Sequence, residues 1–346
     1  MSTSGEAIVL AGEKASGRFV GALEAHLESG RPDVGCYIGL VGLSGVALVS
    51  DGSVWHLVAA FLIPALLSTS AYYAGAYFDR DADAAAKPGR PVPSARMSAR
   101  SALIAMVACA VMGLALAEIH SPPALVLAAV GVLTGALYLL FRGARRSIRV
   151  FTRGIATLAT FGAAVVLTNG SPLWDLALAG LIFWQQDSML HQVLAVADTE
   201  VDRRAGVRTL PSRYGHRAAV VLLVVTFVFW FGSAAFQPAS VRSRPFDTTT
   251  YLPFVAVGTV LAIAALVVLF RTPRPIPGRP VARAYGLLAL ARPCVAAGFV
   301  AAAGDLVLGA VLLVVTWAVT VTAIPPLPAA AAGQGATTDH RDRQHR

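Results

Sequence analysis

The chain is 346 residues long, of which 56% are hydrophobic and 14% are charged, and its mean hydropathy is +0.66. Soluble domains carry about 25% charged residues, so this composition excludes an ordinary soluble domain and indicates an integral membrane protein. The net charge of +9 comes from Lys and Arg divided among short loops between apolar runs, which argues against nucleic-acid binding.

Apolar runs recur along most of the chain, and a transmembrane helix needs about 20 such residues. Residues 1–32 are mixed and charged, and we expect a cytoplasmic N-terminal segment there. The stretch 284–303 is apolar but contains Arg292 and Pro293, so it predicts either a further span or a helix lying against the bundle. The other runs predict nine spans, at residues 33–50, 54–78, 99–117, 122–141, 150–168, 172–197, 217–236, 251–270 and 305–323.

The sequence therefore predicts an all-α integral membrane protein, a bundle of about nine transmembrane helices over residues 33–323. Residues 324–346 are rich in Ala and Gly and then polar, which predicts a disordered tail. With the spans alternating in direction, the four loops 79–100, 142–153, 198–217 and 271–283 share one side. They hold nineteen Lys and Arg, against two in the loops of the other side. The positive-inside rule places the first set in the cytoplasm, and we expect the plasma membrane.

Two acidic blocks stand at the ends of apolar runs in these cytoplasmic loops. The first is Asp79-Arg80-Asp81-Ala82-Asp83 and the second is Asp198-Thr199-Glu200-Val201-Asp202. A helix brings residues i and i+4 to one face, so each block can present two carboxylates to one cation. Carboxylates suit Mg²⁺, which usually shares its coordination shell with substrate phosphates. The alternative is that these acids are ordinary helix-end charges, but two blocks of the same layout on one side favour a pair of metal sites.

Basic residues follow each block and could neutralise the remaining phosphate charge. After the first block they are Lys87 and Arg90, and after the second they are Arg203, Arg204 and Arg208. The sequence thus predicts a polyphosphate held between two metal-binding carboxylate pairs.

Ionisable residues also occur inside the predicted sixth span, where Asp187 and His191 share a helical face with Asp198. Such residues in a span usually face a cavity and mark function, and they could shape the cavity or handle a proton. The alternative is a buried Asp–His pair that only orients helices. Tyr72, Tyr73 and Tyr77 precede the first block and either line the same cavity or belong to the aromatic belt of the membrane interface.

The two acidic segments resemble the two signatures of the UbiA superfamily of intramembrane prenyltransferases. The first is Phe78 to Asp83 followed by Lys87-Pro88-Gly89-Arg90-Pro91, and the second runs from Asp198 to Pro211. The resemblance implies an all-helical bundle around a central cavity open to lipid. It also implies Mg²⁺-dependent ionisation of an isoprenyl diphosphate at the cytoplasmic end, with the prenyl chain in the apolar cavity below.

Carried onto this chain, the resemblance assigns one Mg²⁺ to Asp79 and Asp83 and another to Asp198 and Asp202. Contacts to the diphosphate are implied for basic residues, and Tyr73, Asp187 and His191 are further candidates for the substrate cavity. The basic residues are Lys87, Arg90, Arg146, Arg149, Arg203 and Arg208.

The first signature departs from the family pattern, because Gly75 and Ala76 stand where the family has Asn and often Asp. Three functions remain open at this point. Prenyl transfer to an aromatic or other small lipophilic acceptor is the expected one. The alternatives are cyclisation of the prenyl chain, as in the membrane terpene cyclases of the superfamily, and a transporter or non-catalytic membrane protein that keeps the fold.

Overall fold

The structure, a computed structural model, describes residues 19–49, 53–140, 146–168, 176–197, 199, 203, 209–241, 245–272 and 278–323, and these contain helices but no strand. A helix over residues 19–30 comes first, and the short helix α4 (Arg80–Ala86) follows the second long helix. The long helices are α2 (Pro32–Val49), α3 (Val54–Phe78), α5 (Ala99–His120), α6 (Pro122–Leu140), α7 (Arg146–Val165), α8 (Ala177–Ala197), α10 (Leu210–Ser240), α11 (Thr248–Arg271), α12 (Gly278–Ala302) and α13 (Leu306–Ala323).

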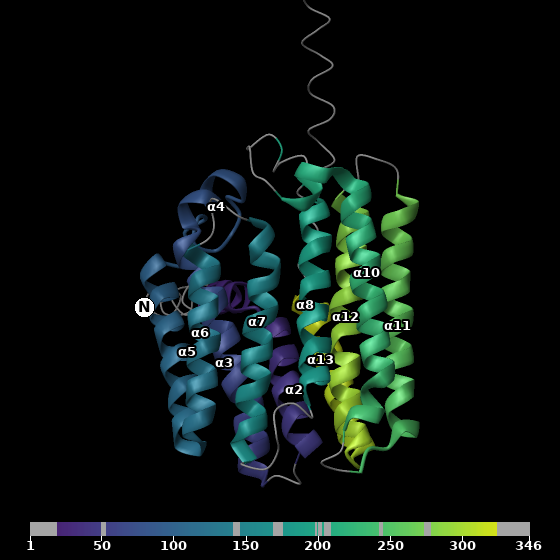
Figure 1. Cartoon of the computed structure of the whole chain (residues 1–346). Helices are drawn as coiled ribbons and strands as arrows, with labels where there is room; N and C mark the ends of the chain where they lie inside the picture. The colour runs from purple at the N-terminus through teal and green to yellow at the C-terminus, as the bar shows by residue number, and fades with distance from the viewer. Residues whose placement is uncertain are drawn as a thin grey trace, which may run out of the picture.

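The long helices pack side by side along a common direction, as Figure 1 shows. Seven of them (α2, α3, α5, α10, α11, α12 and α13) are long and apolar enough to cross a membrane, and α6 and α7 contain shorter apolar helices. Many large apolar side chains on the rim are exposed, including Val111, Phe229 and Val260, as expected where lipid tails replace water. The protein is an all-α integral membrane protein, and the long helices in its described residues number ten, the higher of the two numbers that the sequence allowed.

The tenth helix is α12, which settles the question raised by Arg292 and Pro293. It is a continuous helix of 25 residues that includes Pro293, and it packs against α2, α8, α11 and α13. Together with α2 it is the most buried of the candidate spans. Arg292 is tolerated because its charge is paired inside the bundle, as described below.

Helix α2 can reach the middle of the bundle because its glycines allow α3 to approach closely. A Cβ atom on Gly42 would lie 2.1 Å from the carbonyl oxygen of Ala60 and 2.5 Å from Pro64, so no side chain fits at this crossing. Small residues at helix interfaces give this kind of backbone contact in membranes.

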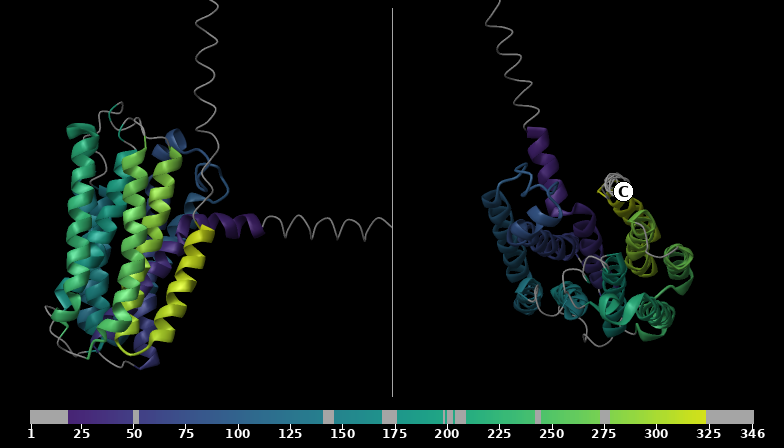
Figure 2. Two further views of the ribbon diagram at one scale, coloured as in Figure 1. Left: turned by 90° about the vertical axis from the view of Figure 1, so that its right-hand side faces the viewer. Right: turned by 90° about the horizontal axis from the view of Figure 1, so that it is seen from above.

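The helix ends next to the acidic and basic segments lie at one end of the bundle. In Figure 1 this is the upper end, where α4 lies and where α8 finishes. Because α12 and α13 form a final antiparallel pair, α13 also finishes toward this end (Figure 2).

Candidate active site at the α3–α4 turn and the bundle core

The first acidic block forms a continuous helical turn between α3 and α4. Asp79 has right-handed helical backbone angles (φ −89°, ψ −2°) and ends α3. Its N–H donates to the carbonyl oxygen of Gly75 at 2.9 Å, and the N–H of Asp83 donates to the carbonyl oxygen of Asp79 at 2.7 Å. The i to i+4 relation expected from the sequence is therefore present in the backbone, and it places Asp79 and Asp83 on one face.

The loop after α4 folds back onto Asp83. The guanidinium of Arg90 donates to the Oδ2 atom of Asp83 at 2.6 Å, and the Asp83 side chain is buried. Lys87 ends α4 and is exposed. Asp81, by contrast, is 89% exposed and pairs loosely with Arg80 at 3.6 Å, so it does not join the other two carboxylates.

The chemistry of the donor set at this turn suits Mg²⁺, since two carboxylates share a face beside a cationic side chain. Gly75 lies one turn before Asp79 and has open space at the position of a Cβ atom. Ala76 packs against the apolar cluster around Met97. Within the described ranges no group of three or more His, Cys, Asp or Glu side chains is arranged to hold a metal.

The essential positions of the second acidic segment lie outside the described residues. They are Asp198, Asp202 and Arg208. Helix α8 ends at Ala197, directly before this block, and Arg203 is helical and exposed. Arg146 and Arg149 belong to the first turn of α7, which begins at the same end of the bundle as α4 (Figure 1). The described end of α8, the start of α7 and the first acidic block therefore lie at one end of the bundle.

A buried ion pair lies deeper in the bundle, between α8 and α12. Arg292 donates to the Oδ1 atom of Asp187 at 2.7 Å, and the two residues are 5% and 3% exposed. The hydroxyl of Thr157 on α7 donates to the other carboxylate oxygen. The guanidinium carbon of Arg292 lies 4.2 Å from the ring centroid of Tyr37 on α2, a cation–π contact. Four helices thus meet at one polar centre.

Sequence reasoning found Asp187 but missed Arg292 as its partner. Arg292 entered only as an interruption of an apolar stretch, and nothing in the spacing along the chain links residues 105 positions apart. One signal in the sequence could have linked them. An unpaired charge inside a membrane span is costly, so an Arg and an Asp that both lie in spans are expected to pair. His191 lies one turn beyond Asp187 toward the acidic end and is half-buried.

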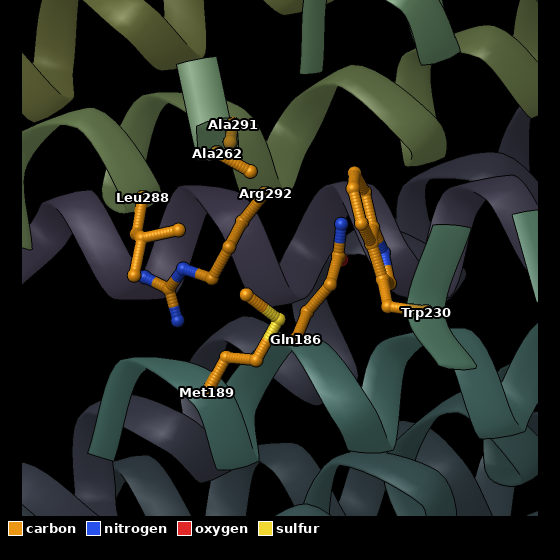
Figure 3. Close-up of a pocket in the computed structure, with 7 residues that line it drawn as sticks. All are labelled: Gln186, Met189, Trp230, Ala262, Leu288, Ala291 and Arg292. Atoms are coloured by element: carbon orange, nitrogen blue, oxygen red, sulfur yellow. The ribbon is translucent and has the colours of Figure 1, made fainter. Parts of the chain in front are cut away.

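A small cavity of about 10 Å³ adjoins the ion pair and is shown in Figure 3. Gln186, Met189, Trp230 and Arg292 line it, together with apolar residues of α11 and α12. The Nε atom of Arg292 and the indole nitrogen of Trp230 are buried and find no hydrogen-bond acceptor among the described residues. A cavity of this size holds about one water molecule, which would satisfy such donors.

A second ion pair, not anticipated from the sequence, fixes the start of α2. Arg31 has a left-handed backbone (φ 51°) and donates to both carboxylate oxygens of Asp33, at 2.9 and 2.8 Å. It also donates to the hydroxyl of Tyr285 on α12 at 3.2 Å and lies 5.7 Å from the ring centroid of Tyr72. Burial by itself would lower the pKa of Arg31, but the hydrogen bond to Asp33 and the electrostatic interactions with Tyr285, Tyr72 and Asp33 together raise it.

Tyr73 occupies a different place from the one expected. Its hydroxyl donates to the carbonyl oxygen of His26, and the His26 ring lies 3.1 Å from the same hydroxyl oxygen. Its ring packs against Gly30. Tyr73 therefore anchors the N-terminal helix, whereas its neighbour Tyr72 faces Arg31. This position differs from the expectation that Tyr73 lines the substrate cavity.

Comparison with known proteins identifies the family. The family model described as "UbiA prenyltransferase family" matches residues 37–285. A digeranylgeranylglyceryl phosphate synthase of Halobacterium salinarum is 36% identical over 193 residues, which are 55% of this chain and 66% of the relative. The chain thus spans just under two thirds of that relative's length.

Solved structures show the same fold. A UbiA homologue from Archaeoglobus fulgidus bound to GPP and Mg²⁺ superimposes with a TM-score of 0.57 at 16% identity, over 86% of this chain and 99% of that one. A digeranylgeranylglyceryl phosphate synthase structure superimposes with a TM-score of 0.61 at 21% identity, over 82% of this chain and 98% of that one. Because the family model covers most of the chain and the helical bundle agrees with it, this protein belongs to the UbiA prenyltransferase family.

Proposed function

We propose that this protein is a Mg²⁺-dependent prenyltransferase that ionises an isoprenyl diphosphate and transfers the prenyl group to an acceptor within the membrane. The observation that carries the proposal is the α3–α4 turn, where Asp79 and Asp83 share a face beside Arg90 at the end of a membrane-spanning bundle. The family membership and the prenyl-transferring relatives support the same reaction.

In this proposal the metal ligands are Asp79 and Asp83 from the first block and Asp198 and Asp202 from the second. Mg²⁺ bound there would neutralise the negative charge that develops on the departing diphosphate. Arg90, already held beside Asp83, and Lys87 contribute positive charge to the same group. Arg146, Arg149, Arg203 and Arg208 are the further candidates for diphosphate contacts, because the topology directs them to this end.

In this proposal the apolar helices keep water away from the reacting prenyl group. An allylic cation formed at the diphosphate end reacts with water unless the site excludes it. The buried Asp187–Arg292 pair lies about 15 Å below the end of α8 at Ala197, given ten residues at a rise of about 1.5 Å each. We assign this pair and Tyr37 a positioning role, because they hold α2, α8 and α12 together below the acidic end. His191, between this pair and the acidic end, is a candidate for contact with the prenyl chain.

For the acceptor, the Halobacterium relative points to a glyceryl phosphate that carries a prenyl ether. The loop charges support the proposal that the acidic end faces the cytoplasm, and we propose the plasma membrane as the location. This orientation can be tested in intact cells by placing single cysteines at each end of the bundle and labelling them with a membrane-impermeant thiol reagent.

The decisive experiment uses purified protein in lipid nanodiscs with geranyl, farnesyl or geranylgeranyl diphosphate, with and without Mg²⁺ and with and without a prenylated glyceryl phosphate. We expect diphosphate release that requires Mg²⁺ and the acceptor. Release without any acceptor, together with a cyclic hydrocarbon or alcohol, would instead identify a terpene cyclase. No release under any condition would leave only a transporter or non-catalytic membrane protein.

Matched variants separate the carboxylates that bind metal from surface charge. We expect Asp79→Asn and Asp202→Asn to abolish turnover. Asp81→Asn is the control, because its side chain is 89% exposed and lies apart from the other two acids of its block. Equal loss in all three variants, or wild-type rates in all three, would contradict the assignment.

A further inference from the structure

The helix over residues 19–30 carries an apolar face that no part of the described bundle covers. Phe19, Leu23 and Leu27 are 70%, 49% and 50% exposed, and Val20 is 48% exposed. Because positions 19, 23 and 27 are four residues apart, they lie above one another on one face of the helix. In a protein with a water-exposed N-terminal helix, this face would be polar.

The other two faces of the same helix have different partners. Ala25 is buried against the bundle in a cluster with Tyr73, Met97 and Ala102, and Ser29 is also buried. The ring of His26 joins this attachment, with one nitrogen near the Tyr73 hydroxyl and the other 3.0 Å from the hydroxyl oxygen of Ser101.

The acidic face points toward the loop that follows the first acidic block. Glu24 and Glu28 are exposed, and Glu28 pairs with Arg96 at 2.8 Å. The helix therefore presents three separate faces, one to the bundle, one to the charged loop end and one, which is apolar, to the outside.

The helix projects from the side of the bundle, close to the ends of two membrane-spanning helices (Figure 2). It runs across the direction of the long helices in Figure 2. Its contacts reach Ser101, two residues after the start of α5, and Tyr73, five residues before the end of α3. At about 1.5 Å per residue, these positions lie about 3 and 8 Å inside the ends of the two spans. Interfacial amphipathic helices lie at about 5–10 Å.

The apolar face also continues a surface that already faces lipid. Ile104 lies three residues after Ser101 on α5 and is 59% exposed, like other large apolar side chains on the outer side of that helix. A lipid boundary is therefore the occupant that both surfaces share.

We propose that residues 19–30 form an interfacial helix whose face of Phe19, Val20, Leu23 and Leu27 inserts at the boundary between lipid headgroups and acyl chains. Glu24 and Glu28 then remain on the aqueous side, where Glu28 meets Arg96. Docking on lipid would also steady the loop that carries Arg90, because Ala25 of this helix shares an apolar cluster with Met97, and Val92 packs against that cluster. The proposal rests on the membrane bundle and not on prenyl transfer.

The test places an environment-sensitive fluorophore on the full chain, reconstituted in phosphatidylcholine vesicles. The background replaces the three native cysteines by alanine, and single labels are introduced by Leu23→Cys and, as the matched control, Glu24→Cys. Quencher lipids carry a nitroxide either near the headgroup or deep in the acyl chain. We expect a blue-shifted emission for the label at residue 23. The shallow nitroxide should quench this label at least about twofold more strongly than the label at residue 24.

The proposal would be overturned if the labels at residues 23 and 24 showed the same emission, typical of an aqueous environment. An apolar emission at residue 23 that neither nitroxide quenches would also overturn it, since that result would mean a protein partner or a second copy covers the face. Val20→Cys on the same face provides a second label if the Leu23→Cys protein is not monodisperse. None of these signals depends on prenyl diphosphate, so the outcome is separate from that of the turnover assay.

Discussion

Breaking the buried ion pair by Arg292→Met should strongly destabilise the bundle. Arg292 and Asp187 are 5% and 3% exposed, and methionine keeps much of the side-chain volume while removing the charge. The carboxylate of Asp187 would then keep the Thr157 hydroxyl and lose its ionic partner. Removing one partner of a buried pair costs about 3–5 kcal/mol. Loss of the contact between Arg292 and the Tyr37 ring adds to this cost.

The pair can be separated from its neighbours by a double-mutant cycle with Asp187→Asn. Each single variant leaves one buried charge without its partner, whereas the double variant Asp187→Asn/Arg292→Met leaves none. The double variant should therefore lose less free energy of unfolding than the sum of the single losses, by at least about 2 kcal/mol. Charge pairing, and not side-chain size, would then account for the stability.

The assay is unfolding by titration of sodium dodecyl sulfate into mixed micelles, followed by tryptophan fluorescence and by circular dichroism. Trp230 lines the cavity beside Arg292, so its emission reports locally on the change (Figure 3). A loss of less than about 1 kcal/mol for Arg292→Met, or strict additivity in the cycle, would refute the reasoning. Either result would mean that water or lipid headgroups reach the pair.

Three further predictions use the same geometry. Gly75→Asn should lower the Mg²⁺ concentration needed for half-maximal turnover, because the site has room for a side chain one turn before the metal-binding turn; an unchanged Mg²⁺ titration would argue against a ligand position there. Gly42→Ala should lower the melting temperature because its Cβ would meet the carbonyl oxygen of Ala60 at 2.1 Å, whereas Gly135→Ala, with open space, should not. Hydrogen bonds from Thr249 lower the pKa of Asp247, so its stabilising effect should be present at neutral pH and fade as the pH falls below about 4. The difference in melting temperature between wild type and Asp247→Asn should then shrink in acid. A constant difference from pH 7 to pH 3 would contradict a stabilising role for the Asp247 carboxylate.

The sequence alone determined the membrane class and most of the helices. Hydropathy located nine runs because a lipid-facing helix must be apolar over about 20 residues, and the described part of each run coincides largely with one long helix. The spacing of Asp79 and Asp83 also sufficed to predict their shared face, because the i to i+4 relation is local to one helical turn.

Only the tertiary structure decided where charges inside the bundle find their partners. Arg292 looked like an interruption of an apolar stretch. It lies within the continuous helix α12 and pairs with Asp187 on another helix. The role of Tyr73 likewise changed once residues 19–30 folded against it. Partners brought together by helix packing leave no periodic trace in the sequence, whereas apolar surface and helical spacing do, and this is why the topology could be predicted and the buried polar centre could not.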